Sequence, residues 1–207
     1  MAPQFAAGLD HEIRNPLAGI KAAVEILREA EKLSSEGLQM TAAINGEIEQ
    51  IDRTLKQFLE FTSLPQACIE DFPLAELVAS VCDDAGMGSS GRRINVSVPP
   101  TLRVRADISL LQKVVGEVVQ NAIDHAAEPL AVRARVRGSK IVIRISSDGA
   151  PIEREIAKRV FEPFFSTRGR RAGLGLPIAQ RRLAAMKGRI RLLPARNGFE
   201  IILPKGR

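Results

Sequence analysis

Two apolar stripes in residues 1–63 constrain the fold of this chain more than any other feature. Their members recur in steps of three and four residues, which is the spacing of one face of an α-helix. The first stripe consists of Ile13, Leu17, Ile20, Val24 and Leu27. The second consists of Met40, Ile44, Ile48, Ile51, Leu55 and Phe58. We therefore predict two long amphipathic helices, one over residues 4–32 and a second that ends near residue 63.

A short polar segment separates the two stripes. The run Ser34-Ser35-Glu36-Gly37 interrupts the pattern and is predicted to form the turn between the helices. Two long helices joined by so short a connection form an antiparallel hairpin. One hairpin cannot bury both stripes, so we predict that two copies of the chain pair as a four-helix bundle. The alternative is a hairpin that packs on the rest of its own chain.

The net charge changes sign along the chain. Residues 1–66 hold 6 Lys and Arg against 10 Asp and Glu, whereas residues 67–207 hold 24 against 14. This asymmetry predicts two domains, 1–66 and 67–207, of which the second attracts an anion. Nucleic acid and the phosphates of a nucleotide both fit that charge. The chain has no Trp or Tyr on which bases could stack, which argues against nucleic acid.

The second half alternates between strand and helix patterns. Strands are predicted over residues 95–98, 102–104, 130–137, 140–146, 189–193 and 198–203. Helices are predicted between them, among them one capped by Asp107 that runs to about residue 126 and one over residues 177–186. The mixture predicts an α/β two-layer sandwich, with helices on one face of a mixed sheet.

Composition favours a cytosolic setting. No apolar run approaches the roughly 20 residues that span a bilayer, and the N-terminus lacks the pattern of a signal peptide. The two cysteines, Cys68 and Cys82, form neither a disulfide framework nor a metal site. We therefore expect no membrane contact in this segment.

The first helix carries a titratable face. In His11-Glu12-Ile13-Arg14-Asn15-Pro16-Leu17, a turn of about 100° per residue places His11 nearly opposite the centre of the stripe and Asn15 close to His11. The imidazole is therefore expected to point to solvent. Taken alone, this pattern also fits an ordinary surface histidine.

Four further motifs follow in the second half. Glu117 and Asn121 lie four residues apart on a predicted helix, and their oxygens suit a hydrated Mg²⁺. SSDGAPI, at residues 146–152, follows a strand, and FEPFFST occupies residues 161–167. GLGL, at residues 173–176, precedes a helix, where glycines let backbone N–H groups approach a phosphate.

HEIRNPL resembles the phospho-acceptor box of bacterial sensor histidine kinases. QNAIDHA, SSDGAPI, FEPFFST and GLGLPIAQ resemble, in order, the asparagine, first glycine, phenylalanine and second glycine boxes of their ATP-binding domain. Gyrase, the heat-shock chaperone ATPases and the MutL repair proteins share that domain. The resemblance covers nearly the whole chain, and the short, arginine-rich segment between the last two boxes is similar to the lid of nitrogen-regulation sensors. It implies an α hairpin that forms a dimeric four-helix bundle, followed by an ATP-binding α/β sandwich.

The resemblance implies a role for each residue of the first box. His11 would accept the γ-phosphoryl group of ATP on a ring nitrogen. Glu12 would orient the imidazole and take up its proton. Asn15 would position a water molecule that dephosphorylates the partner, a response regulator receiver domain.

The resemblance also implies a binding site for ATP and Mg²⁺. Asn121 would bind the metal and the phosphates, with Glu117 as a second metal ligand, and Phe161, Phe164 and Phe165 would anchor the lid. The nucleotide site would comprise Asn121, His125, Ser147, Asp148, Gly149, Phe161, Thr167, Gly173, Leu174, Gly175 and Leu176.

The sequence departs from the family pattern at several positions. Ser147 stands where the family has the aspartate that reads adenine, and Asp148 is one residue away, on the opposite face of a regular strand. A local bulge would restore Asp148 to the reading position. Arg171 replaces the first glycine of the second glycine box. Glu117 replaces a family asparagine; the chaperone relatives have a water-activating Glu there.

These patterns lead to one main hypothesis and two alternatives. The main hypothesis is the cytosolic, dimeric core of a sensor histidine kinase, which phosphorylates His11 and passes the group to a regulator aspartate. It is either the cytosolic part of a larger sensor or a protein regulated in trans. The first alternative is a degenerate kinase that relays phosphoryl groups through His11 without ATP. The second is an ATPase module of the gyrase and chaperone superfamily with a nucleic-acid-linked role.

Overall fold

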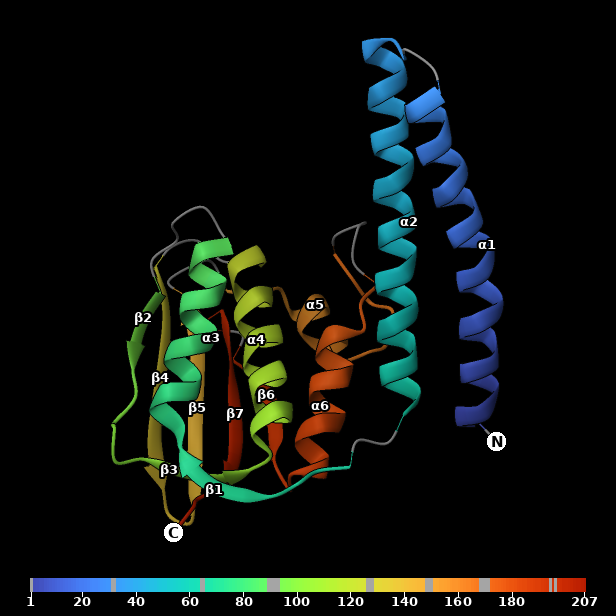
Figure 1. Ribbon diagram of the computed structural model, residues 1–207. Coiled ribbons are helices and arrows are strands. Elements are labelled where there is room, and N and C mark those ends of the chain that lie inside the picture. The colour runs from blue at the N-terminus through green and yellow to red at the C-terminus, as the bar shows by residue number, and fades with distance from the viewer. Residues whose placement is uncertain are drawn as a thin grey trace. The chain divides into compact units, whose positions relative to one another are not determined.

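The computed structural model describes residues 2–30, 33–63, 66–88, 94–125, 129–147, 151–167, 172–193, 195 and 197–207. The chain divides into two compact units, shown in Figure 1. The first consists of Met1–Leu64 with Ser166–Leu174, and the second of Pro65–Phe165 with Gly175–Arg207.

The first unit contains the predicted helical hairpin, formed by α1 (Ala2–Ala30) and α2 (Ser35–Thr62) (Figure 1). The helix α1 continues through Pro16. Val24 of α1 is buried, as are Ile48 and Leu55 of α2, so part of the two predicted stripes lies between the helices. None of the described helices in the chain is both long enough and apolar enough to cross a membrane.

The turn predicted at Ser34–Gly37 is wrong for its last three residues. Ser34 is the N-cap of α2, and its Oγ accepts a hydrogen bond of 3.1 Å from the backbone N–H of Gly37. A serine in this position satisfies an N–H group that the first turn of a helix leaves without a partner. The polar run therefore starts the second helix, and residues 35–37 form its first turn.

Polar contacts also join the two helices. Arg14 Nε lies 3.5 Å from a carboxylate oxygen of Asp52, and the side-chain amide of Asn45 donates a 3.4 Å hydrogen bond to Glu25. A hydrogen bond from Lys56, reinforced by the charges of Arg14 and Arg53, lowers the pKa of Asp52. These contacts fix the helix that carries the His11 motif against α2.

The second unit is built around a five-stranded sheet in the order β2-β4-β5-β7-β6. Its strands are β2 (Ile94–Ser97), β4 (Leu130–Arg137), β5 (Lys140–Ser147), β7 (Gly198–Pro204) and β6 (Arg189–Leu193). β2 and β4 are parallel, and the other pairs are antiparallel. A two-stranded sheet of β1 (Glu70–Pro73) and β3 (Arg103–Ala106) completes the strands.

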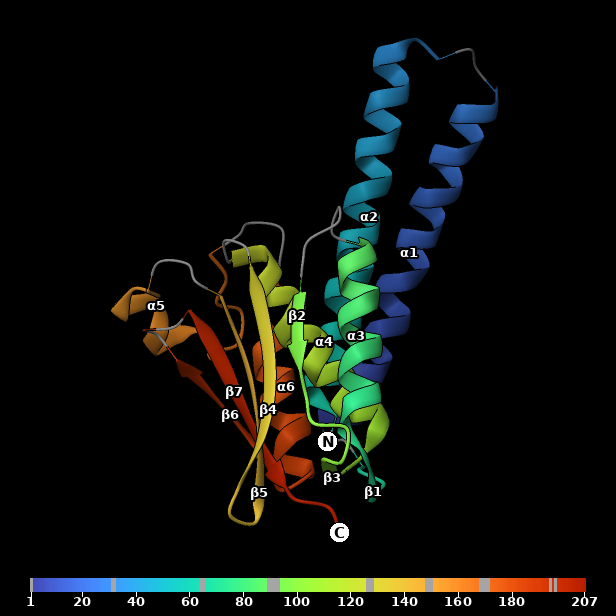
Figure 2. The same cartoon turned by 90° about the vertical axis from the view of Figure 1, so that its left-hand side faces the viewer.

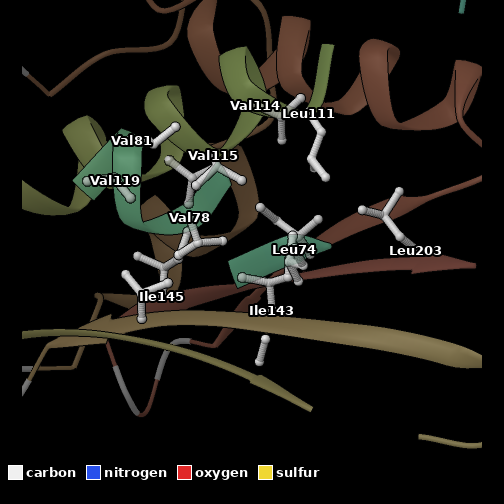
Figure 3. Close-up of a cluster of buried hydrophobic side chains, with 14 of the residues drawn as sticks. Leu74, Val78, Val81, Leu111, Val114, Val115, Val119, Ile143, Ile145 and Leu203 are labelled. Atoms are coloured by element: carbon white, nitrogen blue, oxygen red, sulfur yellow. The ribbon is translucent and has the colours of Figure 1, made fainter. Parts of the chain in front are cut away.

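Three helices cover one face of this sheet, as Figure 2 shows: α3 (Leu74–Gly88), α4 (Ile108–His125) and α6 (Gly175–Ala185). A fourth, short helix is α5 (Arg154–Arg159). Alternate residues of β5, namely Ile141, Ile143 and Ile145, are fully buried and face the helices. Figure 3 shows Ile143 and Ile145 beneath the apolar side chains of α3 and α4. The predicted α/β sandwich with a mixed sheet is confirmed.

Asp107 joins three parts of the sandwich. One of its carboxylate oxygens accepts a 2.8 Å hydrogen bond from the N–H of Leu110, which confirms it as the cap of α4. The other oxygen accepts a 2.8 Å bond from the N–H of Cys68, just before β1. Its own N–H donates to Met186 Sδ, at 3.4 Å, just after α6. Asp107 therefore connects the start of α4 and the residue after the end of α6 to the segment that precedes β1.

Glu200 is a buried acid on the face of the sheet away from the helices, with only 1% of its surface exposed. It lies on β7 between Arg144 of β5 and Arg191 of β6, which are its partners in register. Both guanidinium groups donate two hydrogen bonds to the carboxylate. Burial alone raises the pKa of Glu200, but these bonds outweigh it and hold the pKa below its ordinary value.

We predict that Glu200→Gln destabilises the sandwich at neutral pH by roughly 1–3 kcal/mol, since it removes the charge that both arginines require. Because the folded pKa is lowered, this stabilisation exists above the unfolded pKa, near ~4.3, and is lost as the pH falls through the folded value. The measurement is urea unfolding of both proteins from pH 7 to pH 3. Their difference in unfolding free energy should shrink towards pH 3; a constant difference would contradict this account of Glu200.

Candidate functional site

Several residues of the predicted nucleotide site lie at one end of the sandwich. Leu130, the first residue of β4, pairs with Ser147, the last residue of β5. The helix α4 ends at His125, five residues before Leu130. His125 therefore lies near the end of β5 that carries Ser147, and Asn121 is one helical turn before it. His125 is exposed and Asn121 is half-buried.

The first turn of α6 packs closely on α4 beside Asn121. A Cβ atom at Gly175 would lie only 1.7 Å from Oε1 of Glu117, so a side chain at that position requires Glu117 to move. Pro177 is buried within the first turn of α6, where its missing N–H is harmless. The predicted metal ligand Glu117 and the predicted phosphate-binding turn are thus in direct contact.

Ser147 is 5% exposed and shares a strand face with Ile143 and Ile145, so its hydroxyl lies on the helix side of the sheet. The side-chain amide of Asn197 donates a 3.2 Å hydrogen bond to Ser147 Oγ, and the N–H of Ser147 donates to the carbonyl of Asn197 at 3.3 Å. Because Oγ accepts this bond, its own O–H remains able to donate. Asn197 is a part of the site that the sequence did not indicate, apart from the turn-forming pair Asn197-Gly198.

The phenylalanines of the third box occupy three environments. Phe161 packs on the core, and its ring meets that of Phe199 edge-on, with centroids 6.3 Å apart. The guanidinium of Arg159 lies 4.2 Å from the centre of the Phe165 ring. Phe164 is 62% exposed and has a φ of 65°, a left-handed backbone that is uncommon for a bulky residue. Phe161 and Phe165 therefore hold this segment, whereas Phe164 does not contribute to the core.

The remaining predicted residues are placed to different extents. Thr167 and Asn15 are exposed, Leu174 is buried, and Gly173 has a left-handed φ of 67°. Leu176, in the first turn of α6, packs partly on the core. Seven other residues of the prediction lie outside the part that the structure describes. They are His11 and Glu12, for their side chains, and Asp148, Gly149, Arg168, Arg170 and Arg171.

The donor set suits a nucleotide with a hydrated metal ion. Among the described residues, no group of three or more His, Cys, Asp or Glu side chains forms a metal site. Asn121 and Glu117 instead offer two side chains with oxygen atoms. Mg²⁺ binds to such a small number of protein oxygens when phosphate oxygens and water molecules complete its coordination shell. The buried hydroxyl of Ser147 and the N-terminus of α6 add a polar group for a base and N–H donors for phosphate.

Comparison with known families agrees with this arrangement. The profile described as "His Kinase A (phospho-acceptor) domain" matches residues 3–67. The profile described as "Histidine kinase-, DNA gyrase B-, and HSP90-like ATPase" matches residues 106–206.

Two curated relatives are similar over almost the entire chain. The signal transduction histidine-protein kinase AtoS of Escherichia coli is 30% identical over 97% of this chain and 34% of its own length. The sensory histidine kinase/phosphatase NtrB of Rhodobacter capsulatus is 29% identical over 97% of this chain and 61% of its own length. The chain thus spans from about a third to three fifths of these relatives.

Solved structures share the fold. Full-length ShkA, in complex with AMPPNP, superposes with a TM-score of 0.81 at 22% identity, over 100% of this chain and 46% of ShkA. The catalytic domain of the histidine kinase ThkA superposes with a TM-score of 0.59 at 27% identity, over 67% of this chain and 96% of that domain. With both profiles in the family's order, the chain belongs to the two-component sensor histidine kinases, of which it forms the catalytic core.

Proposed function

We propose that this core phosphorylates itself on His11 with ATP and transfers the phosphoryl group to an aspartate of a response regulator. The observation that carries the proposal is the close packing of Gly175, where α6 begins, on Glu117 of α4, one helical turn before Asn121. We assign phosphotransfer and dimerisation to residues 1–66, ATP binding to residues 67–207, and a cytosolic location to both. The profile matches over residues 3–67 and 106–206 support this division.

ATP with Mg²⁺ supplies the phosphoryl group in this proposal. Asn121 and Glu117 offer oxygens to the metal, while the first turn of α6, with Gly173 and Leu174 before it, offers N–H groups to the phosphates. Thr167 provides a hydroxyl group at the start of the lid. Phe161, which packs on Phe199, fixes the segment that precedes Thr167. The protein contributes position and charge neutralisation, which is how phosphoryl transfer is generally catalysed.

The histidine side of the reaction depends on the first turns of α1. A ring nitrogen of His11 forms the new N–P bond as the bond from the γ-phosphorus to ADP breaks, and Glu12 takes up the imidazole proton. Asn15 is exposed on the same helix, one turn after His11. The side-chain amide of Asn15 is therefore accessible to a response regulator and to the water molecule that would dephosphorylate that regulator.

The hairpin is proposed to function as a homodimer. Five members of the two predicted stripes are between 43% and 60% exposed: Ile20, Leu27, Met40, Ile44 and Ile51. Soluble monomers rarely leave apolar residues together on one helical hairpin. Pairing two hairpins into a four-helix bundle would remove this surface from water.

Base recognition is proposed to differ from that of the family. An aspartate at position 147 would accept a hydrogen bond from the amino group of adenine. Ser147 instead already accepts one from Asn197 and has an O–H to donate. An O–H donor can bind a ring nitrogen, which both bases have, or the carbonyl oxygen of guanine. The site is therefore expected to discriminate weakly between adenine and guanine.

Gly175→Ala should lower both the stability of the protein and its affinity for ATP, because it disturbs the packing of α6 on α4. The added methyl group would displace Glu117, and overpacking of this kind costs roughly 1–3 kcal/mol of stability. Thermal unfolding and ATP titration should both show the loss, and Glu117→Ala in the same protein should restore the stability. Gly116→Ala is the matched control, because its Cβ would meet only Val81 at 3.8 Å. A helical Gly→Ala change there should stabilise by roughly 0.5–1 kcal/mol. A Gly175→Ala protein as stable as wild type would contradict the close packing.

Light scattering should give a mass near twice the 22.5 kDa of one chain. Ile44→Glu places a charge on the exposed stripe and should shift the protein towards a monomer. Gln39→Glu adds the same charge at a neighbouring polar, exposed position and should leave the dimer intact. A monomeric wild type at tens of micromolar, with helical circular dichroism preserved, would show that the hairpin does not dimerise.

Incubation with Mg²⁺ and labelled ATP should produce an acid-labile, base-stable phosphoramidate on His11. His11→Gln should abolish the label. Asn15→Ala, one turn away on the same helix, should retain it while reducing the dephosphorylation of a phosphorylated regulator. Label that persists on a serine or threonine after His11→Gln would rule out the histidine kinase assignment.

Ser147→Asp should tighten ATP binding about tenfold, since a charged hydrogen bond exceeds a neutral one by roughly 1–2 kcal/mol. It should also raise the preference for ATP over GTP in calorimetric titrations. Ser146→Asp is the matched control, because residue 146 lies on the opposite face of β5 and should leave both affinities unchanged.

The same titrations separate the kinase from the relay. If the wild type binds no ATP at millimolar concentration, yet His11 accepts phosphoryl groups from a phosphorylated regulator, the core is an ATP-independent relay.

A further inference from the structure

The face of the five-stranded sheet away from α3, α4 and α6 carries most of the positive charge of the sheet. On each strand, the residues that alternate with the core positions point to this face. We call them the basic face: Arg133, Arg135, Arg137, Lys140, Arg144, Arg189 and Arg191. All but Arg144 are exposed, and Arg144 is half-buried.

The strand register arranges these cations in two rows across four strands. One row runs Arg133, Arg144, Glu200, Arg191, so Glu200 is its only acid.

The neighbouring row runs Arg135, Val142, Ile202, Arg189. Val142 and Ile202 are 3% and 7% exposed, and they lie between the cations of β4 and β6 in this row. From β4 to β6 the rows extend about 14 Å, three strand spacings.

This arrangement works against the stability of the isolated sheet. Arg133 lies directly opposite Arg144, and Arg137 opposite Lys140, and like charges in such pairs are destabilising. Within the part of the chain that the structure describes, Arg133, Arg135 and Arg137 have no carboxylate partner. A solvated sheet face needs only polar residues, so three cations on one strand without a carboxylate partner indicate a ligand.

The nucleotide does not account for this charge. Ser147, Asn121 and Gly175 lie on the helix side of the sheet or on the helices themselves. The basic face points the other way, and the sheet with its packed core separates the two. The basic face is therefore free of the nucleotide and can meet a second anionic partner.

A hollow adjoins one corner of the basic face. It has a volume of about 230 Å³ and opens beside Lys140 and Arg189, with Lys187 as a third cation. Ile202, Leu203 and Pro204 form its apolar wall. None of the described residues that line it is acidic. A hollow with cationic and apolar walls suits a protein side chain that anchors an interface.

We propose that the basic face docks an acidic surface of a partner protein. Arginine forks bind carboxylates in a bidentate manner and are enriched at protein interfaces. Nucleic acid fits less well, because the described residues of this face include no aromatic side chain for stacking. A lipid surface fits less well too, because none of the exposed large apolar residues of the described chain lies among them to insert.

The test compares the triple variant Arg133→Glu, Arg135→Glu, Arg137→Glu with a control of equal charge change, Lys113→Glu, Arg154→Glu, Arg207→Glu. The control residues are exposed, and none of them lies on a strand of the five-stranded sheet. The full chain is labelled at Cys68, which is exposed, whereas Cys82 is buried and its pKa is raised to about 11. The probes are polyglutamate, a DNA duplex of equal total charge, and phosphatidylserine–phosphatidylcholine vesicles.

At about 50 mM salt, the wild type should bind polyglutamate more tightly than the DNA duplex or the vesicles. The affinity for polyglutamate should fall as the salt concentration rises. The triple variant should lose at least about tenfold in affinity and the control less than twofold. Equal losses in both variants, no binding of polyglutamate, or tighter binding of DNA or vesicles through the same arginines would overturn the proposal. Arg133→Gln with Arg135→Gln and Arg137→Gln should reproduce the loss if the reversal variant does not fold.

Discussion

The one-sided burial of the five-stranded sheet is the constraint on which the rest of the sandwich depends. Three helices cover one face, so the residues of each central strand that point to this face are mostly apolar, and the residues between them face away from the helices. Ile141, Ile143 and Ile145 obey this rule, and Ser147 ends the same row. The alternation therefore decides which polar residues can reach the nucleotide end and which can only face outward. A shift of one residue in β5 would exchange the two sets.

Close packing of two helices then sets the geometry of the site. Gly175 brings the start of α6 against Glu117, and Asp107 links the start of α4 to Met186, just beyond the end of α6. The N-terminus of α6 and the carboxylate of Glu117 are therefore fixed relative to each other by backbone contact. In the proposed site, this packing would hold the metal and phosphate ligands in place without a dedicated cluster of acids, since ordinary helix packing orients them.

Patterns with a fixed period were predictable from the sequence, and contacts between distant residues were not. The apolar stripes predicted α1 and α2, and alternation predicted β4 and β5 with their turn at Gly138. The N-cap role of Ser34 was missed because serine serves both turns and helix starts. The bond between Asn197 and Ser147 spans 50 residues, and Glu200 requires two partner strands; neither has a local signature.

In the proposed site, the serine at the base-reading position affects nucleotide affinity more than the chemical step. A contact to the base is made equally in the ground state and in the transition state, so its loss weakens nucleotide binding without slowing transfer at saturation. In the proposed mechanism the reacting γ-phosphoryl group depends instead on Asn121, Glu117 and the first turn of α6, where Gly175 packs on Glu117. An altered first glycine box is therefore compatible with full catalytic competence when nucleotide is abundant. Its main consequence is which nucleotide is bound, and at what concentration.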